Sequence, residues 1–143
     1  RSFSSKQQIK KVVRQNPITG SYYSLFKKDK SKGIVVCEGL HDAMAVRILF
    51  NDYDILCLNS TVHTDKALTE LFHYDQIILA TDNDIAGQTA KQKIIKTLQG
   101  QGKGLYEVKF NAKDIDEAFR RKENITVMSI KDIEKENGLT ADL

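Results

Sequence analysis

The stretch "GIVVCEGLHDAMAV" (residues 33–46) opens as a run of apolar residues typical of a buried strand and ends that run on a carboxylate, Glu38. Gly39 follows, and the next residues have the amphipathic pattern of a helix over residues 41–50. In an open parallel sheet, ligands bind outside the carboxyl ends of the strands. The position of Glu38 therefore marks one end of the sheet as a candidate functional site.

Short apolar runs alternate with helical patterns along most of the chain. We expect strands at residues 33–38, 54–59, 76–82 and 104–110, separated by helices at residues 41–50, 64–74, 85–99 and 115–122. This alternation predicts β-α-β units and an α/β fold with a mainly parallel sheet. Residues 123–143 form a C-terminal extension or linker that could add a strand and a helix.

The composition is that of one compact domain. The chain has 143 residues, 41% of them hydrophobic. No apolar run approaches the roughly 18 residues of a membrane span, and the N-terminus lacks the apolar segment of a secretory signal, so we expect a cytoplasmic protein with no membrane contact. Cys37 and Cys57 lie in apolar strand-like runs without a C-x-x-C pair, which predicts buried core thiols and no zinc site.

Positive charge is concentrated at the N-terminus. Residues 1–33 hold nine bases and one acid, whereas the remainder holds 13 bases and 18 acids. Residues 1–32 are thus a basic N-terminal arm or connector: either a solvated leader or a patch that faces a nucleic-acid backbone. Tyr22, Tyr23 and Phe26 interleave the bases and would either stack on nucleotides or pack against the core. The candidate nucleic-acid-binding residues are Lys10, Lys11, Arg14, Lys27, Lys28, Lys30 and Lys32.

Carboxylates recur where the predicted strands end. Asp82 and Asp84 straddle the end of the third strand with the i, i+2 spacing that directs both side chains to one face. A second pair with this spacing follows the fourth strand, and one more acid lies a helical turn after Glu38. The complete set is Glu38, Asp42, Asp82, Asp84, Asp114 and Asp116.

Six carboxylates along one edge would repel one another and raise one another's pKa values unless a cation lies between them. Oxygen ligands open to water and phosphate suit Mg²⁺ or Mn²⁺. Purely structural interpretations exist for some of them. Asp84 could be a helix N-cap, Asp42 a first-turn acid favoured by the helix dipole, and Asp114 with Glu117 a variant of the capping box.

The same residues carry a resemblance to a known family. The segments "VVCEGLHDAMAV" (35–46), "ILATDNDIAGQTA" (78–90) and "KDIDEAF" (113–119) resemble the acidic motifs of Toprim domains. "DNDIAG" (82–87) is similar to the version found in DnaG-type bacterial primases and phage primase–helicases. One departure is "LNSTV" (58–62), where relatives often carry a glycine after the second strand.

The resemblance implies a compact Toprim-like α/β domain at residues 33–122, with a four-stranded, mainly parallel sheet flanked by helices. It implies that Glu38 handles a proton at the attacking hydroxyl and that Asp82 and Asp84 hold Mg²⁺, for which Mn²⁺ can substitute. Asp42, Asp114 and Asp116 would complete the site. It further implies RNA primer synthesis from NTPs on a single-stranded DNA template, in a bacterium, phage or mobile element, with the remainder of a primase or a replicative helicase as partner.

Two features of a complete primase or primase–helicase are missing from the sequence. The cysteine count leaves no zinc module, and no G-x-x-x-x-G-K-[ST] phosphate loop occurs. With a first residue other than Met, this favours either a piece of a larger polymerase or a small stand-alone Toprim protein. Two alternatives to primer synthesis stay open: a metal-dependent nuclease, which would use the same carboxylates, and a non-catalytic nucleic-acid-binding module.

Overall fold

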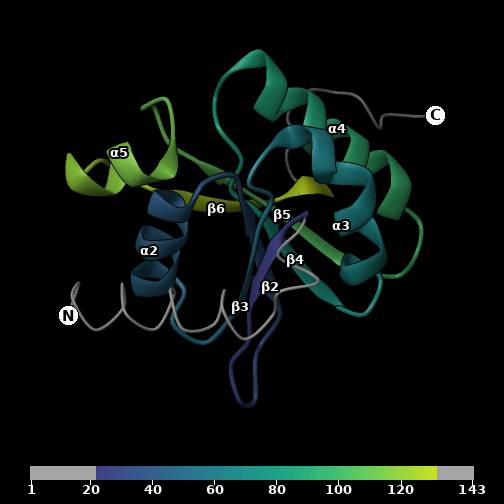
Figure 1. Ribbon diagram of the computed structural model, residues 1–143. Helices are drawn as coiled ribbons and strands as arrows, with labels where there is room; N and C mark the ends of the chain where they lie inside the picture. Colours follow the sequence, from purple (N-terminus) through teal and green to yellow (C-terminus); the bar gives the residue numbers. More distant parts are fainter. Residues whose placement is uncertain (1–21, 132–143) are drawn as a thin grey trace.

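The computed structural model describes residues 22–131, which form a six-stranded sheet with helices on both faces (Figure 1). Four parallel neighbours make up its centre: β3 (Asp54–Cys57), β2 (Ile34–Cys37), β4 (Gln76–Leu79) and β5 (Gly104–Lys109). This confirms the predicted α/β fold and its parallel core.

Two antiparallel strands add to this core at its edges. β1 (Ser24–Phe26) pairs with β3, and β6 (Thr126–Ser129) pairs with β5, so the full order is β1-β3-β2-β4-β5-β6. The sequence pattern did not reveal β1, because it lies inside the basic N-terminal segment. The strand that we considered for the C-terminal segment is β6.

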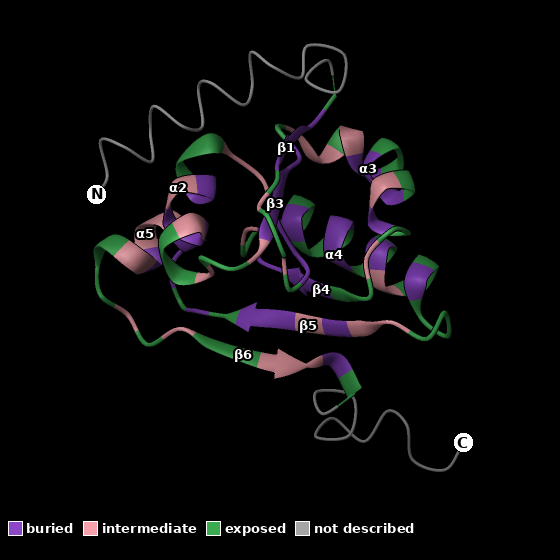
Figure 2. Cartoon of the chain, turned by 90° about the horizontal axis from the view of Figure 1, so that it is seen from below, coloured by how far each residue is buried: buried purple, intermediate pink, exposed green. Residues whose placement is uncertain are grey.

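The helices divide between the two faces of the sheet (Figure 2). One face carries α2 (Leu40–Leu49) and α5 (Ile115–Arg120), and the other carries α3 (Thr64–Leu71) and α4 (Ile85–Leu98), with the short 3-10 helix η2 (Thr61–His63) before α3. Each helix follows the strand before it in the β-α-β order that the sequence predicts.

The core has two layers because successive residues of a strand point to opposite faces. In β2, Val35 and Cys37 pack with the α2–α5 layer, whereas Ile34 and Val36 pack with the α3–α4 layer. Cys37 lies opposite Cys57 in the parallel register, and both are buried free thiols, as the sequence predicted. Between residues 22 and 131, no helix is long and apolar enough to cross a membrane.

Parallel pairing sets the position of the site. The carboxyl ends of the central strands all lie on the same side of the molecule, at the top of Figure 1, and the loops after β2, β4 and β5 all carry acidic residues. The loop between β1 and β2 lies at the opposite ends of the strands, at the bottom of the view. We call the acidic side the carboxylate rim, with Glu38, Asp42, Asp82, Asp84, Asp114 and Asp116 as its members.

Candidate metal centre

Three carboxylates of the rim converge on one point. Glu38 follows β2, while Asp82 and Asp84 lie between β4 and α4. One oxygen of each lies within 4.8 Å of the others, and no other group of three or more Asp, Glu, His or Cys side chains is so arranged within residues 22–131. Glu38 and Asp82 are partly buried, and Asp84 is exposed. The i, i+2 spacing therefore brings the two aspartates together, as the sequence predicted.

A backbone contact joins the two motifs. The N–H of Asp82 donates to Glu38 Oε2 at 2.6 Å. The main chain of Glu38 is held in turn by its carbonyl, which accepts from the N–H of Asn59 at 2.9 Å. The end of β2 is thus fixed by its neighbours on both sides, which orients Glu38 towards the aspartates.

Gly87 allows the start of α4 to approach this junction. A Cβ atom on Gly87 would lie only 2.2 Å from the carbonyl oxygen of Asp82 and 2.7 Å from Glu38 Oε2. The N–H of Gly87 also donates to Asp84 Oδ1 at 2.8 Å, so Asp84 is the N-cap of α4 as well as a member of the cluster. The helix-cap interpretation of Asp84 is confirmed, and it is compatible with a ligand role because the second oxygen is not used by the cap.

Burial and neighbouring charges act together on Asp82. Asp82 Oδ1 is buried and has no hydrogen-bond partner among the described residues. Burial, followed by the charges of Glu38, Asp42, Asp114 and Asp84, raises the pKa of Asp82 to about 7.

Burial also raises the pKa of Glu38. The N–H of Asp82 opposes this increase, and the charges of Asp84, Asp42 and Asp114 add to it. A buried oxygen without a partner beside two further carboxylates fits a bound divalent cation. The all-oxygen donor set is the type that Mg²⁺ and Mn²⁺ prefer, so the residues fit such an ion.

Asp42 lies beside the cluster, but its oxygens make other contacts. Oδ2 accepts from the N–H of Gly39 at 3.1 Å, and Oδ1 accepts from the N–H of Asp116 at 3.1 Å. Burial raises the pKa of Asp42 to about 6, against the effect of these N–H donors and with the charges of Asp114 and Asp116 adding to the increase. Asp42 therefore ties the start of α2 to the start of α5.

The pair after β5 also makes structural contacts. Asp114 is the N-cap of α5, and its Oδ1 accepts from the N–H of Glu117 at 2.8 Å, so the capping interpretation of this residue is confirmed. Asp116 Oδ2 accepts from Arg120 Nε at 3.0 Å. The structure does not bring either residue into the group of three convergent carboxylates.

Two asparagines that the sequence analysis did not single out shape the rim. Asn59, directly after β3, has a φ of 66°, in the left-handed region where asparagine is tolerated better than most residues. Asn83, between the two aspartates, donates through Nδ2 to the carbonyls of Phe110 at 2.8 Å and Ala112 at 2.7 Å. The departure from the family pattern at residues 58–62 could have drawn attention to the first, whereas the partners of the second come only from the fold.

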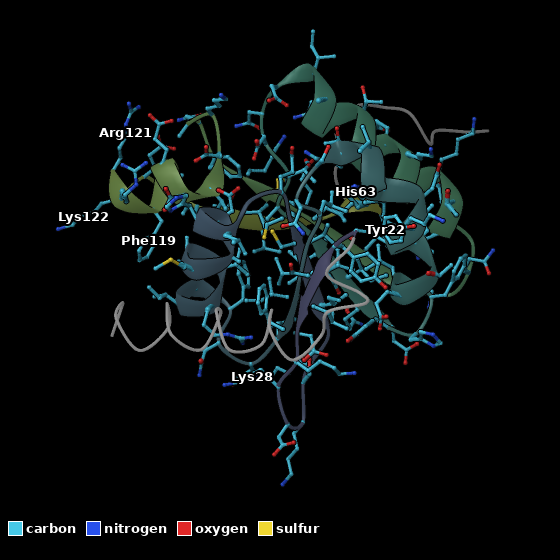
Figure 3. All side chains as sticks on the ribbon, in the orientation of Figure 1. Tyr22, Lys28, His63, Phe119, Arg121 and Lys122 are labelled. Carbon is cyan, nitrogen blue, oxygen red and sulfur yellow. The ribbon has the colours of Figure 1, made fainter. Side chains whose placement is uncertain are left out.

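The candidate nucleic-acid-binding lysines that the structure describes lie away from the cluster. Lys28, in the loop between β1 and β2, lies at the end of the sheet opposite to the rim (Figure 3). Lys27, Lys30 and Lys32 belong to the same loop, and Lys32 pairs with Asp52 at 3.4 Å. The remaining three candidates, Lys10, Lys11 and Arg14, lie outside the described residues.

The aromatic residues of this region divide between core and surface. Tyr23 and Phe26 are buried core residues. Tyr22 is exposed, and its ring meets the edge of His63 with 5.9 Å between the ring centres (Figure 3). Stacking on nucleotides is therefore open only to Tyr22 among the three.

Known structures with this fold include two primases. One is the primase fragment of the bacteriophage T7 primase-helicase protein, with 24% identity and a TM-score of 0.55 over 69% of this chain and 44% of that chain. The other is a DNA primase domain from Pseudomonas aeruginosa, with 20% identity and a TM-score of 0.51 over 76% of this chain and 38% of that chain. The chain thus spans less than half the length of either structure. No curated protein matches the sequence.

A family-level match covers the three convergent carboxylates. The family described as Toprim-like matches residues 35–119, more than half of the chain, from the second residue of β2 to the last but one of α5. Glu38, Asp82 and Asp84 all lie inside this span. The chain belongs to the Toprim-like family.

Proposed function

We propose that this chain is the metal-binding catalytic part of a primase-type nucleotidyltransferase, which joins NTPs into an RNA primer on single-stranded DNA. The observation that carries the proposal is the convergence of Glu38, Asp82 and Asp84 within 4.8 Å, with Asp82 Oδ1 buried and unpartnered among the described residues. The primase structures with the same fold support this reaction over others. The remainder of a primase, or a replicative helicase, would supply the rest of the enzyme.

In this proposal Asp82 and Asp84 are the principal ligands of Mg²⁺ or Mn²⁺, with Glu38 beside them. A bound divalent ion supplies electrostatic stabilisation of phosphate oxygens and of the leaving group. Asp42, Asp114 and Asp116 add negative charge to the rim and fix the starts of α2 and α5, through the contacts described above.

Glu38 is the proton acceptor of the proposed reaction. Its Oε2 is held by the N–H of Asp82, and its Oε1 has no hydrogen-bond partner within residues 22–131. A 3′-hydroxyl would give its proton to this free oxygen while its own oxygen bonds to the α-phosphorus of an NTP. The bond from the α-phosphorus to the bridging oxygen then breaks, and pyrophosphate leaves. The raised pKa of Glu38 makes it a better base than a solvated glutamate.

The substitution Glu38→Gln tests this role. It should be made in the longer protein, or in this chain with the missing half added in trans, and primer synthesis and Mn²⁺ binding should both be measured. We expect Mn²⁺ affinity close to that of the wild type and a loss of activity of about 10²- to 10⁴-fold, the usual contribution of a general base. Glu70→Gln, on α3, is a control that should keep both properties. Normal primer synthesis by Glu38→Gln would show that another group takes the proton.

Two other outcomes would replace the proposed reaction. Nicking of labelled DNA in the absence of NTPs, lost in Asp82→Asn, would identify a metal-dependent nuclease. Nucleic-acid binding that is sensitive to salt but indifferent to Mg²⁺, with neither reaction detectable, would identify a binding module. Primer synthesis on a single-stranded template is therefore the first assay to perform.

We further propose that the lysines of the loop between β1 and β2 anchor the template strand away from the rim. Each lysine that contacts a phosphate of single-stranded DNA should contribute about −0.7 to the slope of log K against log salt concentration. The slope should be measured before and after glutamine replaces Lys27, Lys28, Lys30 and Lys32. An unchanged slope would mean that these lysines make no phosphate contacts.

A further inference from the structure

A cavity of about 390 Å³ lies next to the carboxylate rim, on the α4 face of the sheet. Its walls come from the first turns of α4, the carboxyl end of β5 and the start of β6, the two strands that run side by side at one edge of the sheet in Figure 2. Ligand pockets of roughly 300–1,000 Å³ hold small organic molecules, so this cavity has room for one nucleotide. The polar residues that line it include Asn83, Gln88, Lys91, Glu107, Asn111 and Asn124.

The charge of the cavity is opposite to that of the rim. Lys91 is only 4% exposed, and its Nζ lies 2.5 Å from Glu107 Oε1. Lys109 Nζ approaches the other oxygen of Glu107 at 3.6 Å. Two ammonium groups thus face one carboxylate, which leaves a net positive charge. This excludes a second cation site and favours a ligand that carries an anionic group.

The cavity also offers amides that the fold does not use. The side chains of Asn111 and Asn124, two exposed residues, have no hydrogen-bond partner within residues 22–131, and Gln88 makes only a long contact of 3.5 Å with Asn83. A carboxamide presents a donor and an acceptor side by side. Asparagine and glutamine use this pair to bind the edge of a nucleobase, with adenine as the usual partner. The lining is therefore suited to a ligand with both a base and a phosphate.

The cavity and the cluster share one stretch of chain. Asn83 lies between Asp82 and Asp84, and Gln88 follows Asp84 by four residues, about 6 Å along the axis of α4. We propose that the cavity binds one nucleotide, with its base against the amides of Asn111 and Asn124 and its phosphate near Lys109. The proposal rests on the proposed function, because it treats this nucleotide as part of the substrate of the rim. Two sources share this chemistry, a free NTP and one residue of a single strand.

Binding to the 143-residue chain without metal tests the assignment. Adenosine 5′-monophosphate, ribose 5-phosphate and a short oligodeoxyadenylate should each be titrated in EDTA, with the side-chain amide signals of Asn111 and Asn124 followed by NMR. We expect the two signals to shift with the monophosphate and the double variant Asn111→Ala/Asn124→Ala to bind about tenfold more weakly, the effect of losing one or two neutral hydrogen bonds. Gln101→Ala, an exposed amide in the turn after α4, should bind as the wild type does.

The three probes distinguish the possible ligands of the cavity. Binding of the oligonucleotide but not of the monophosphate, with the same dependence on the two asparagines, would support the site and identify the single strand as its source. Equal affinity for ribose 5-phosphate would overturn the proposal, because the base would then make no contribution. An absence of shifts at both amides with all three probes would also overturn it. Binding by this chain needs neither metal nor catalysis, so the two proposals can fail separately. Nucleotide binding by this chain, with no primer synthesis by the longer protein, would refute the proposed function and keep the cavity. Primer synthesis at wild-type KM by the longer protein carrying the double substitution would do the reverse.

Discussion

Replacing Asp82 with asparagine should stabilise the metal-free protein. The pKa of Asp82 is about 7 in the folded chain, compared with 3.8 for an aspartate in water. Each tenfold change in proton affinity corresponds to about 1.4 kcal/mol, so the folded state is penalised by at most about 4 kcal/mol when Asp82 is ionised. Because the side chain is partly exposed and water screens its neighbours, we expect about 1–2 kcal/mol.

The sign of the effect depends on pH. Folded Asp82 holds its proton more tightly than unfolded Asp82, so the penalty is absent below about pH 4, grows as the pH rises and is complete above about pH 7. In EDTA at pH 8, Asp82→Asn should therefore raise the free energy of unfolding by about 1–2 kcal/mol and Tm by roughly 3–10 °C. At pH 4 the two proteins should unfold together.

Bound Mn²⁺ should make the wild type more stable than Asp82→Asn at pH 8. A ligand present at a hundred times its Kd stabilises the folded state by about 2.7 kcal/mol, and only the wild type should receive this gain in full from Mn²⁺. Thermal unfolding followed by circular dichroism at pH 4 and pH 8, with and without Mn²⁺, tests both parts. Asp75→Asn, an exposed aspartate at the other end of β4, is the matched control and should change neither. Equal Tm values for wild type and Asp82→Asn in EDTA at pH 8 would refute the electrostatic argument.

Two further substitutions probe the packing around the site. Gly87→Ala should cost about 1–3 kcal/mol in unfolding free energy, because its Cβ would lie 2.2 Å from a backbone oxygen. The control Gly39→Ala, whose Cβ would meet nothing closer than 3.5 Å, should be as stable as the wild type. Equal denaturant midpoints for the two variants would contradict this prediction. Lys91→Met should lower the free energy of unfolding in urea by about 3–5 kcal/mol, because it leaves Glu107 buried without its close partner. Adding Glu107→Leu should recover most of this loss. If Lys91 had only a steric role, the second substitution would not restore stability.

The central part of the fold could be predicted because its signals are local. The apolar run of β2 and the helical pattern of α2 each depend on residues close together in the sequence, and the same holds for β4 and α4. β1 could not be predicted this way. It has only three residues inside a basic segment, and it is a strand because it pairs with β3, about 30 residues further along the chain.

The candidate site, like the fold, could be predicted only where its signals are local in the sequence. The spacing of Asp82 and Asp84 and their place after a strand were enough to predict that they converge with Glu38. The sequence could not reveal that the N–H of Asp116 reaches Asp42, because these residues are 74 positions apart and meet only when α2 and α5 pack together. A carboxylate that the sequence places at the rim can thus also join the starts of two helices.

The two antiparallel edge strands have a consequence for anyone who shortens this protein. The parallel core ends at β3 on one side and at β5 on the other, and the segments that cover these edges, β1 and β6, come from residues before 33 and after 122. A chain cut back to residues 33–122 would keep every carboxylate of the rim but would present two rows of unpaired backbone N–H and C=O groups to solvent. Exposed edges of this kind pair with other molecules, so such a fragment should self-associate and precipitate even though its metal ligands are intact.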